Sequence, residues 1–287
     1  MNEKRIADEL PLVSVVVPCY NHAQWVESCI KSVSEVDYPR IELLLLDDGS
    51  SDASFEYAKI AIRKNGVKFE RVWIEKQTNQ GITKTFNRLV ANSCGKYVVP
   101  LASDDELTKQ GIASCVAYLE QGDNANSLLI INVDVIDETG LRICDTRIDK
   151  YSGKLKGHKL FRDIVIFFGT PYQHQIFSRK IFDQVGGYDE GLKYEDLDLA
   201  LRFVGLGRIS VIEEKVKKYR VWRNGATTPG LSQEDLNRTP IYKKNMPLQK
   251  GAIWLLFYFK VKGEHSRFHN FISRLLAKMH LLSLKTL

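Results

Sequence analysis

Three pairs of acidic residues stand out in this sequence because their side chains could do chemistry. Asp47-Asp48 and Asp104-Asp105 each follow a run of apolar residues, and Glu195-Asp196 opens an amphipathic segment. Carboxylates are the hard oxygen ligands that suit Mg²⁺ or Mn²⁺, and such an ion would neutralise a diphosphate. A carboxylate at a second strand end could instead accept a hydrogen bond from the N–H of a pyrimidine base, and Tyr20 could stack on that base. Glu195-Asp196 could supply a general base, provided that burial raises its pKa towards the working pH.

Each pair also has an ordinary structural explanation. Asp, Gly and Ser are standard turn residues, so Asp47-Asp48-Gly49-Ser50 fits a turn. Asp104-Asp105 fits a solvated turn or the N-cap of a helix. Glu195, Asp196 and Asp198 would stabilise a helix simply by lying near its positive N-terminal end. The residue types alone therefore leave both explanations open.

The elements around these acids are predicted to bring the first two pairs together. The first half of the chain alternates short apolar runs with helical patterns, which is typical of βαβ units and of a mostly parallel sheet flanked by helices. Asn21 with Gln24 resembles a capping box that starts a helix after the first strand. Strands are predicted over 13–17, 41–46, 67–74, 97–101 and 128–136, and a further helix over 81–93. Such sheets bind ligands outside the carboxyl ends of their strands, so Tyr20, Asp48 and Asp104-Asp105 are expected at one site.

The alternation loosens after residue 136. A helix is predicted from Glu195, and strands are predicted over 209–212 and 216–222. Residues 226–247 are rich in Thr, Pro, Asn and Gln, which indicates a loop. The segment from Lys250 mixes aromatic residues with Lys and Arg, which suits a helix lying on anionic lipid headgroups. The alternative for that segment is a helix that docks on the protein's own core.

Composition and missing motifs exclude several classes of protein. With 41 Lys+Arg, 35 Asp+Glu and 44% hydrophobic residues, the chain is an ordinary globular protein and neither disordered nor a coiled coil. It has no apolar run of about 18 residues and no apolar signal segment at its start, so we expect a cytoplasmic location. Neither GxGxxG nor a P-loop motif occurs, which argues against dehydrogenases and P-loop enzymes. The net charge of +6 is modest and no nucleic-acid-binding pattern is visible, so we expect no nucleic-acid partner.

Seven short motifs follow one another along the chain. They are Val-Val-Val-Pro-Cys-Tyr-Asn (15–21), Leu-Asp-Asp-Gly-Ser-Ser-Asp (46–52), Asn-Gln-Gly-Ile (79–82), Gly-Lys-Tyr (95–97), Ser-Asp-Asp-Glu (103–106), Gly-Gly-Tyr-Asp-Glu (186–190) and Glu-Asp-Leu-Asp-Leu (195–199). Each motif is weak alone, but their order and spacing over residues 11–223 resemble those of family 2 glycosyltransferases.

The resemblance implies a GT-A fold, in which one α/β domain has a Rossmann-like half that binds a nucleotide-sugar and a half that binds the acceptor. We therefore divide the chain into a domain over 1–225, with a donor part at 11–136 and an acceptor part at 137–225. Residues 226–287 would form a loop and a C-terminal basic and aromatic helical extension. The implied activity is inverting transfer of a sugar from a nucleotide-sugar, usually a UDP-sugar, to a hydroxyl of a glycan or lipid-linked acceptor.

The same resemblance suggests an enzyme class and a setting. The class is that of hexosyl- or N-acetylhexosaminyltransferases, and bacterial relatives of this type act in surface-polysaccharide biosynthesis, for example of O-antigen in the cell envelope. Such enzymes commonly act at the inner face of the plasma membrane, which is where the C-terminal tail would make peripheral contact. The sequence specifies neither the donor sugar, nor the acceptor and linkage, nor the oligomeric state.

The residues of the family's site carry over one position at a time. The implied donor contacts are Pro18, Tyr20, Asn21, Asp48, Lys84 and Asp104. Asp48 would accept a hydrogen bond from the uracil N–H. Asp105 would bind Mn²⁺ or Mg²⁺, with Asp104 at the ribose or in the metal shell. Asp196, in the pair Glu195-Asp196, would be the catalytic base.

Three positions depart from the family pattern. Ala102 stands where many relatives have the first acid of the metal motif. Phe86 stands where relatives often have an arginine that faces the donor phosphates, so Lys84 or Arg88 would supply that charge. Trp222 stands about where some relatives have a histidine metal ligand, which leaves the metal dependence open.

Two other functions compete with this interpretation. The departures suggest a non-catalytic module that keeps nucleotide-sugar binding but lacks the chemistry. A sugar-1-phosphate nucleotidyltransferase would also combine nucleotide binding with a metal-binding acid. That class would show a Gly-rich loop with a basic residue after the first strand, whereas this chain has Pro18-Cys19-Tyr20-Asn21 there.

Overall fold

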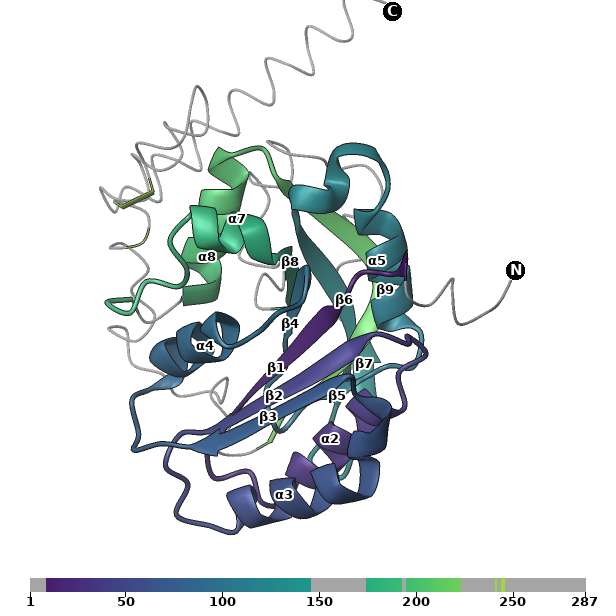
Figure 1. Cartoon of the computed structure of the whole chain (residues 1–287), viewed down its shortest axis with the longest axis vertical. Helices are drawn as coiled ribbons and strands as arrows, with labels where there is room; N and C mark the ends of the chain where they lie inside the picture. Colours follow the sequence, from purple (N-terminus) through teal and green to yellow (C-terminus); the bar gives the residue numbers. More distant parts are fainter. Residues whose placement is uncertain (1–8, 146–173, 193–194, 223–240, 242–243, 246–287) are drawn as a thin grey trace, which may run out of the picture.

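A single mixed sheet runs through the computed structural model, which describes residues 9–145, 174–192, 195–222, 241 and 244–245 (Figure 1). The strand order is β3-β2-β1-β4-β8-β6-β9-β5, with β7 paired to β6. The strands are β1 Val13–Cys19, β2 Ile41–Asp47, β3 Arg71–Lys76, β4 Tyr97–Pro100, β5 Glu106–Leu107, β6 Leu128–Ile136, β7 Arg142–Asp145, β8 Gln175–Ser178 and β9 Ile209–Arg220. The α-helices are α2 Val26–Ser34, α3 Ser54–Asn65, α4 Ile82–Ala91, α5 Gly111–Leu119, α7 Arg179–Gln184 and α8 Glu195–Gly205, with short 3-10 turns at Gly66–Lys68 and Gly122–Asn126.

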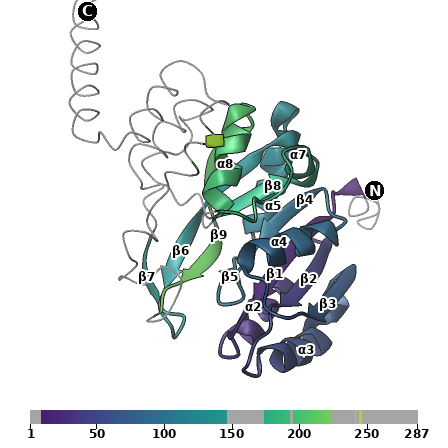
Figure 2. The ribbon, with the colours of Figure 1, turned by 90° about the vertical axis from the view of Figure 1, so that its left-hand side faces the viewer.

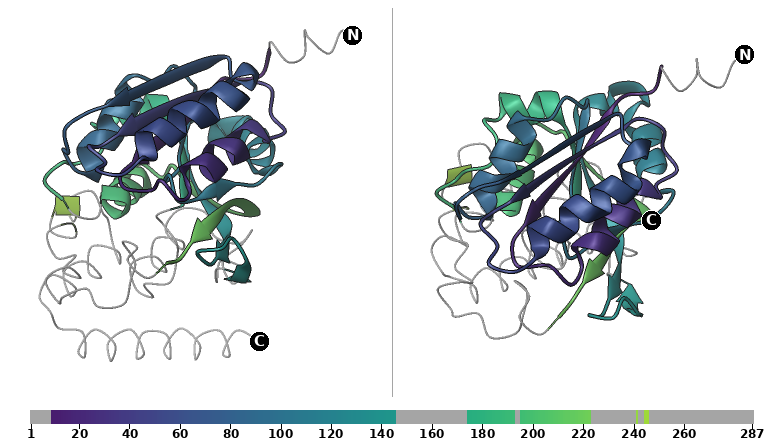
Figure 3. Two further views of the ribbon diagram at one scale, coloured as in Figure 1. Left: turned by 90° about the horizontal axis from the view of Figure 1, so that it is seen from below. Right: turned by 60° about the horizontal axis from the view of Figure 1, so that its bottom comes forward.

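The first four strands pair in parallel, as the apolar runs predict. Every residue of β1 and β2 is buried, which is expected of parallel strands covered on both faces. Alternate side chains divide the core in two. Val16 and Leu44 pack with Leu89 of α4 in one cluster, and Val15 and Leu43 lie in the other with residues of α2, α3 and α5. Figure 2 shows α4, α7 and α8 on the first face, and Figure 3 shows α2 and α3 side by side on the other.

The second half of the sheet changes direction. Strand β8 is antiparallel to β4 and to β6, whereas β6 and β9 are parallel and β5 is antiparallel to β9. The predicted α/β class is confirmed, and the parallel arrangement holds for the first half of the chain, where the alternation indicated it. Because Tyr97 pairs with Ser178 and Val98 with Phe177, the start of β8 lies beside the carboxyl end of β4. The reversal therefore brings residues of the second half to the edge where the strand-end acids lie.

Two predicted strands differ from those observed. The strand expected at 67–74 is wrong at its start, because α3 runs to Asn65, a 3-10 turn follows and β3 begins at Arg71. Phe69 packs on the core from the residue after that turn, so its apolar character does not mark a strand. The strands expected at 209–212 and 216–222 are one strand, β9. The pairing with β6 shifts between them, and the exposed Glu213 and Glu214 lie in this irregularity.

The capping box predicted at Asn21 and Gln24 is also wrong. Helix α2 begins at Val26 with Trp25 in the N-cap position and without a side-chain cap. Asn21 has a φ of 54°, a left-handed conformation that Asn tolerates better than most residues, and its Oδ1 accepts a hydrogen bond from the N–H of Ser51 (2.9 Å). The asparagine thus joins two loops and does not start a helix.

The end of the chain is described only at three positions. Of the loop predicted at 226–247, Ile241 and Asn245 are buried and Ile241 packs in the cluster that contains α8. The basic and aromatic tail from Lys250 lies outside the described residues. Among the residues that the structure describes, no helix is long and apolar enough to cross a membrane.

Candidate functional site

The loops that follow β1, β2 and β4 meet at one edge of the sheet, as predicted from the sequence. The N–H of Asn21 donates to Ser50 Oγ (2.9 Å), which joins the first two loops. His22 Nδ1 lies 2.8 Å from Ser103 Oγ, which joins the first loop to the third. Because these strands are parallel neighbours, the acids that follow them are held at a common edge.

The end of β1 presents one aromatic side chain to solvent. Pro18 is buried as part of the strand, whereas Tyr20 is 49% exposed. Asn21 is also exposed, although its side chain is committed to Ser51. An exposed ring beside buried polar groups can stack on a planar ligand such as a nucleobase.

Asp48 is buried and organises the loop that leads into α4. Its Oδ1 accepts hydrogen bonds from Gln77 Nε2 (2.8 Å) and from the N–H of Gln80 (2.8 Å). Its Oδ2 accepts from the N–H of Gly81 (2.9 Å), the residue before α4, whose φ is +87°. A carboxylate offers about four lone-pair sites, so one remains for a base N–H. Asp48 thus fixes the two residues before α4, and the sequence does not show this contact because Asp48 is far in the chain from that helix.

Asp104 and Asp105 have different surroundings although they are adjacent. The side chain of Asp104 is 14% exposed, and its Oδ2 accepts from Trp222 Nε1 (2.9 Å). His22 Nδ1 lies 3.7 Å from Asp104 Oδ1. Asp105 is buried and its Oδ1 accepts from the N–H of Arg220 (2.9 Å). Burial, together with the charge of Asp104, raises the pKa of Asp105.

Asp104 is the better placed of the two to meet a divalent ion. Among the described residues, no three His, Cys, Asp or Glu side chains form a group that could hold a metal. Mg²⁺ and similar ions are usually held by one or two carboxylates together with substrate phosphates, so a complete protein cage is not required. Asp104 fits this arrangement as a partly exposed oxygen donor. Asp105 points at the end of β9, and Trp222 offers only an N–H donor beside Asp104.

Helix α4 carries the basic residues considered for the donor phosphates. Arg88 donates to Gln77 Oε1 (2.8 Å), forms an ion pair with Glu75 and lies over the ring of Trp73. Lys84 is exposed on the same helix. Since β3 and its loop engage Arg88, Lys84 is the more available of the two cations.

The acids of the second half reach the same edge through β8. Gln175, at the start of β8, donates from Nε2 to the backbone oxygen of Asp196 (2.9 Å). This contact places the first turn of α8 beside the carboxyl end of β4. Burial, together with the neighbouring Asp196, raises the pKa of Glu195 to about 7. A carboxyl group with a pKa near neutrality is suited to proton transfer.

The third acid of this segment is structural. Asp198 is fully buried, and its Oδ2 accepts from Arg202 Nε (2.9 Å) and from Lys244 Nζ (3.0 Å). Its Oδ1 accepts from Asn245 Nδ2 (2.7 Å). Asp198 therefore connects α8 to Lys244 and Asn245, which follow β9 in the chain. The helix-dipole explanation of this acid did not predict these contacts.

A side-chain amide connects α4 to the turn before α8. Asn87 Nδ2 donates to the backbone oxygen of Tyr188, and Asn87 Oδ1 accepts from the N–H of Tyr188, both at 2.9 Å. Gly187 has a φ of +71°, which favours glycine there. The Phe86 ring packs 5.6 Å from the Tyr188 ring. These contacts join the two halves, and Asn87 was not singled out from the sequence.

Comparisons with known proteins identify the family that this chain matches. Residues 14–186 match the family model described as glycosyl transferase family 2. An uncharacterized glycosyltransferase of Rickettsia prowazekii is 27% identical over 231 residues, which is 78% of this chain and 68% of the relative.

Solved structures show the same fold. The S. aureus protein TarS, residues 1–349 in complex with UDP-GlcNAc, superposes with a TM-score of 0.67 at 19% identity and covers 86% of this chain and 72% of that one. In its UDP complex the same fragment gives a TM-score of 0.63 at 20% identity, and the match covers 83% of this chain but only 65% of the fragment. A mannosyltransferase from Pyrobaculum calidifontis, in complex with GDP-Man and Mn²⁺, gives a TM-score of 0.59 at 16% identity over 97% of this chain and 82% of that one. The predicted GT-A type of fold is thereby confirmed.

Proposed function

Because the chain belongs to glycosyl transferase family 2, we propose that it transfers a sugar from a UDP-sugar to a hydroxyl of a glycan or lipid-linked acceptor, with inversion at the anomeric carbon. One observation carries the proposal. Tyr20, Asp48 and Asp104 follow neighbouring parallel strands and lie at the edge of the sheet where Asp196 is also anchored. This edge thus combines groups suited to a base, a diphosphate and an acceptor proton.

The donor would be bound from three loops. Tyr20 would stack on the base, and Asp48 would accept from its N–H with the lone pair that the α4 loop leaves unused. Pro18 and Asn21 would shape the floor of this subsite. Lys84 would face the phosphates as an exposed cation near the start of α4.

The reaction would be a single displacement. Asp196 would remove the proton of the acceptor hydroxyl as that oxygen attacks the anomeric carbon, and the nucleoside diphosphate would leave from the opposite face. Glu195, whose pKa is raised, would hold a proton beside Asp196 and keep the pair from carrying two charges near neutral pH. Mn²⁺ or Mg²⁺, when bound by Asp104 and Asp105 with the donor phosphates, would stabilise the charge on the leaving group.

The substrate class can be narrowed one step further. TarS binds UDP-GlcNAc in a structure of the same fold, which favours a UDP-linked hexose or N-acetylhexosamine for this chain. We place the enzyme in the cytoplasm, in the synthesis of a cell-envelope polysaccharide such as O-antigen. Peripheral membrane contact through the tail stays a prediction of the sequence.

The alternative is a non-catalytic module that binds the nucleotide-sugar. It is favoured by Trp222, which stands about where some relatives have a histidine metal ligand. The indole N–H of Trp222 donates to Asp104 Oδ2 and cannot itself bind a metal. A nucleotidyltransferase has no such support, since the turn after β1 is not a phosphate loop.

Replacement of Asp196 by Asn separates enzyme from module. We expect Asp196→Asn to lower the release of UDP from UDP-GlcNAc and other UDP-sugars by roughly 10²- to 10⁴-fold in the presence of acceptor, which is the range for loss of a general base. The affinity for UDP should stay within about threefold. Asp183→Asn is a matched control, because Asp183 is a 57% exposed acid on α7 that pairs only with Arg179 in the described contacts. Equal turnover of Asp196→Asn and the wild type would refute the assignment of the base.

A further inference from the structure

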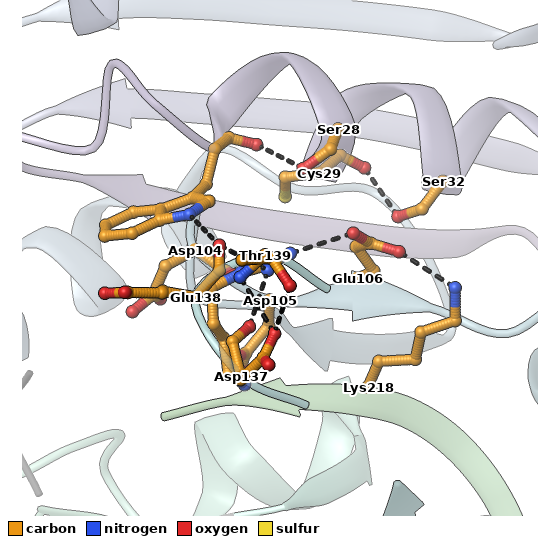
Figure 4. Close-up of polar contacts among 12 residues, drawn as sticks. Ser28, Cys29, Ser32, Asp104, Asp105, Glu106, Asp137, Glu138, Thr139 and Lys218 are labelled. Atoms are coloured by element: carbon orange, nitrogen blue, oxygen red, sulfur yellow. Dashed lines mark hydrogen bonds and ion pairs between the residues drawn. The ribbon is translucent and has the colours of Figure 1, made fainter. Parts of the chain in front are cut away.

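Arg220, the last residue of β9, has a buried guanidinium group, and each of its three nitrogens donates to a protein acceptor. Its side chain is 3% exposed. Nε donates to the backbone oxygen of Asp104 (2.7 Å), and Nη2 donates to Glu106 Oε1 (2.9 Å). Its backbone N–H donates to Asp105 Oδ1 (2.9 Å). Arg220 thus contacts three consecutive residues, Asp104, Asp105 and Glu106, which we call the acid loop and which appear together in Figure 4.

The same guanidinium also holds the tip of the β6–β7 hairpin. Nη1 donates to the backbone oxygens of Asp137 (3.0 Å) and Glu138 (3.3 Å), which face the acid loop in Figure 4. Trp25 Nε1 donates to the same oxygen of Glu138 (3.1 Å), and the Arg220 guanidinium lies 5.9 Å from the Trp25 ring. The hairpin tip is therefore fixed against the acid loop by a shared set of contacts.

Trp222, two residues after Arg220, contacts a side chain of the same loop. Its Nε1 donates to Asp104 Oδ2 (2.9 Å), and its ring packs 4.7 Å from the ring of Trp25. Arg220 therefore fixes the backbone of Asp104 and the carboxylate of Asp105, whereas Trp222 fixes the carboxylate of Asp104. Both groups act from the same end of β9.

These contacts do not suit Arg220 to bind phosphate directly. A guanidinium has five N–H donors in a rigid planar fork, and here each terminal nitrogen and Nε already has a protein acceptor. Its burial also keeps it from a substrate in solution. An ammonium group could not reach the acceptors on both the acid loop and the hairpin with one fixed geometry.

We propose that Arg220 and Trp222 are positioning residues that hold Asp104 and Asp105 in the orientation in which their carboxylates would hold a divalent cation against the diphosphate of the donor. The proposal rests on the proposed function, because it assigns these two acids to the donor. It predicts that loosening either contact weakens nucleotide binding, although neither residue touches the nucleotide.

The test is calorimetric titration of the full chain with UDP, with and without Mn²⁺, for the wild type and for Arg220→Lys, Trp222→Phe and Lys218→Met. Arg220→Lys keeps the charge and loses the fork, and Trp222→Phe keeps a ring and loses the N–H. Lys218→Met is the control, because Lys218 pairs with Glu106 from the same strand (2.9 Å) without a recorded contact to Asp104 or Asp105. Thermal melting of each variant reports folding separately.

We expect Arg220→Lys and Trp222→Phe each to bind UDP at least about tenfold more weakly, with a smaller effect of Mn²⁺. Arg220→Lys keeps the backbone N–H that donates to Asp105 but loses the guanidinium bonds to the backbone oxygen of Asp104 and to Glu106, whereas Trp222→Phe loses the N–H that donates to the Asp104 carboxylate. Lys218→Met should stay within about twofold. Wild-type affinity in a folded Arg220→Lys or in Trp222→Phe would overturn the proposal for that residue. If Arg220→Lys does not fold, Trp222→Phe decides the proposal alone. Absence of UDP binding by the wild type would instead contradict the proposed function.

Discussion

Replacing Glu195 by Gln should change the pH dependence of stability in a defined direction. Burial and the charge of Asp196 raise the pKa of Glu195 from an ordinary value near 4.5 to about 7 in the folded protein. Between these pH values the folded state holds a proton that the unfolded state releases. The carboxyl of Glu195 therefore lowers the free energy of unfolding least below pH 4.5. It lowers this free energy increasingly as the pH rises towards 7.

The size of the effect follows from the two pKa values. Their difference corresponds to roughly 3 kcal/mol between acidic and basic pH, and solvent relaxation around this partly exposed side chain reduces it to about 2 kcal/mol. Gln is close in shape to protonated Glu, so the variant should match the wild type below about pH 4.5 and should already be more stable by about 0.5 kcal/mol at pH 5. At pH 8 the variant should be more stable than the wild type by about 2 kcal/mol. The difference is smaller by a few tenths of a kcal/mol, because the variant also loses the favourable interaction of a negative charge with the N-terminus of α8.

Urea denaturation of the wild type and of Glu195→Gln at pH 5, 6, 7 and 8 measures this difference directly. The stability of the wild type should fall relative to the variant as the pH rises, with the slopes of the unfolding curves unchanged. Transfer activity should persist in Glu195→Gln within about tenfold if Asp196 is the base. A variant that is less stable than the wild type by the same amount at every pH would refute the argument from burial.

Three further substitutions test other parts of the fold. Glu42→Gln should lower the free energy of unfolding by about 3 kcal/mol, because Glu42 is a fully buried carboxylate paired with Arg71. The affinity for UDP should not change, because this pair lies away from the strand-end edge. Urea denaturation measures the first effect and calorimetric titration with UDP measures the second. Asp48→Asn should cost about 1–2 kcal/mol in the same measurement and weaken UDP binding at least about tenfold, since one oxygen that accepts backbone N–H groups is replaced by a donor. Asp198→Ala should lower the melting temperature far more than Lys244→Met, because Asp198 is fully buried whereas Lys244 is 37% exposed.

The sequence was sufficient to predict the strands of the first half of the sheet, because local patterns determine them. The continuous apolar runs at β1 and β2 indicated parallel strands, and the rule that ligands bind at carboxyl strand ends placed Tyr20, Asp48 and Asp104 together. The order of the motifs indicated the family. In each case the signal lies within one short segment.

The remaining features depend on contacts between distant segments. Asp48 accepts hydrogen bonds from the residues before α4, Asn87 pairs with the backbone of Tyr188, and Arg220 joins the acid loop to a hairpin. Their residue types and local spacing are unremarkable. The failed capping box at Asn21 has the same cause, since its side chain bonds to Ser51 of the neighbouring loop instead of to its own helix.

The central claim is that the strand-end edge binds a nucleotide-sugar. Calorimetric titration of the purified chain with UDP, GDP, CDP and dTDP, each with and without Mn²⁺, tests it most directly. We predict that UDP binds most tightly, that Mn²⁺ strengthens its binding, and that Asp48→Asn weakens it. Failure of all four nucleotides to bind under either condition would contradict the claim.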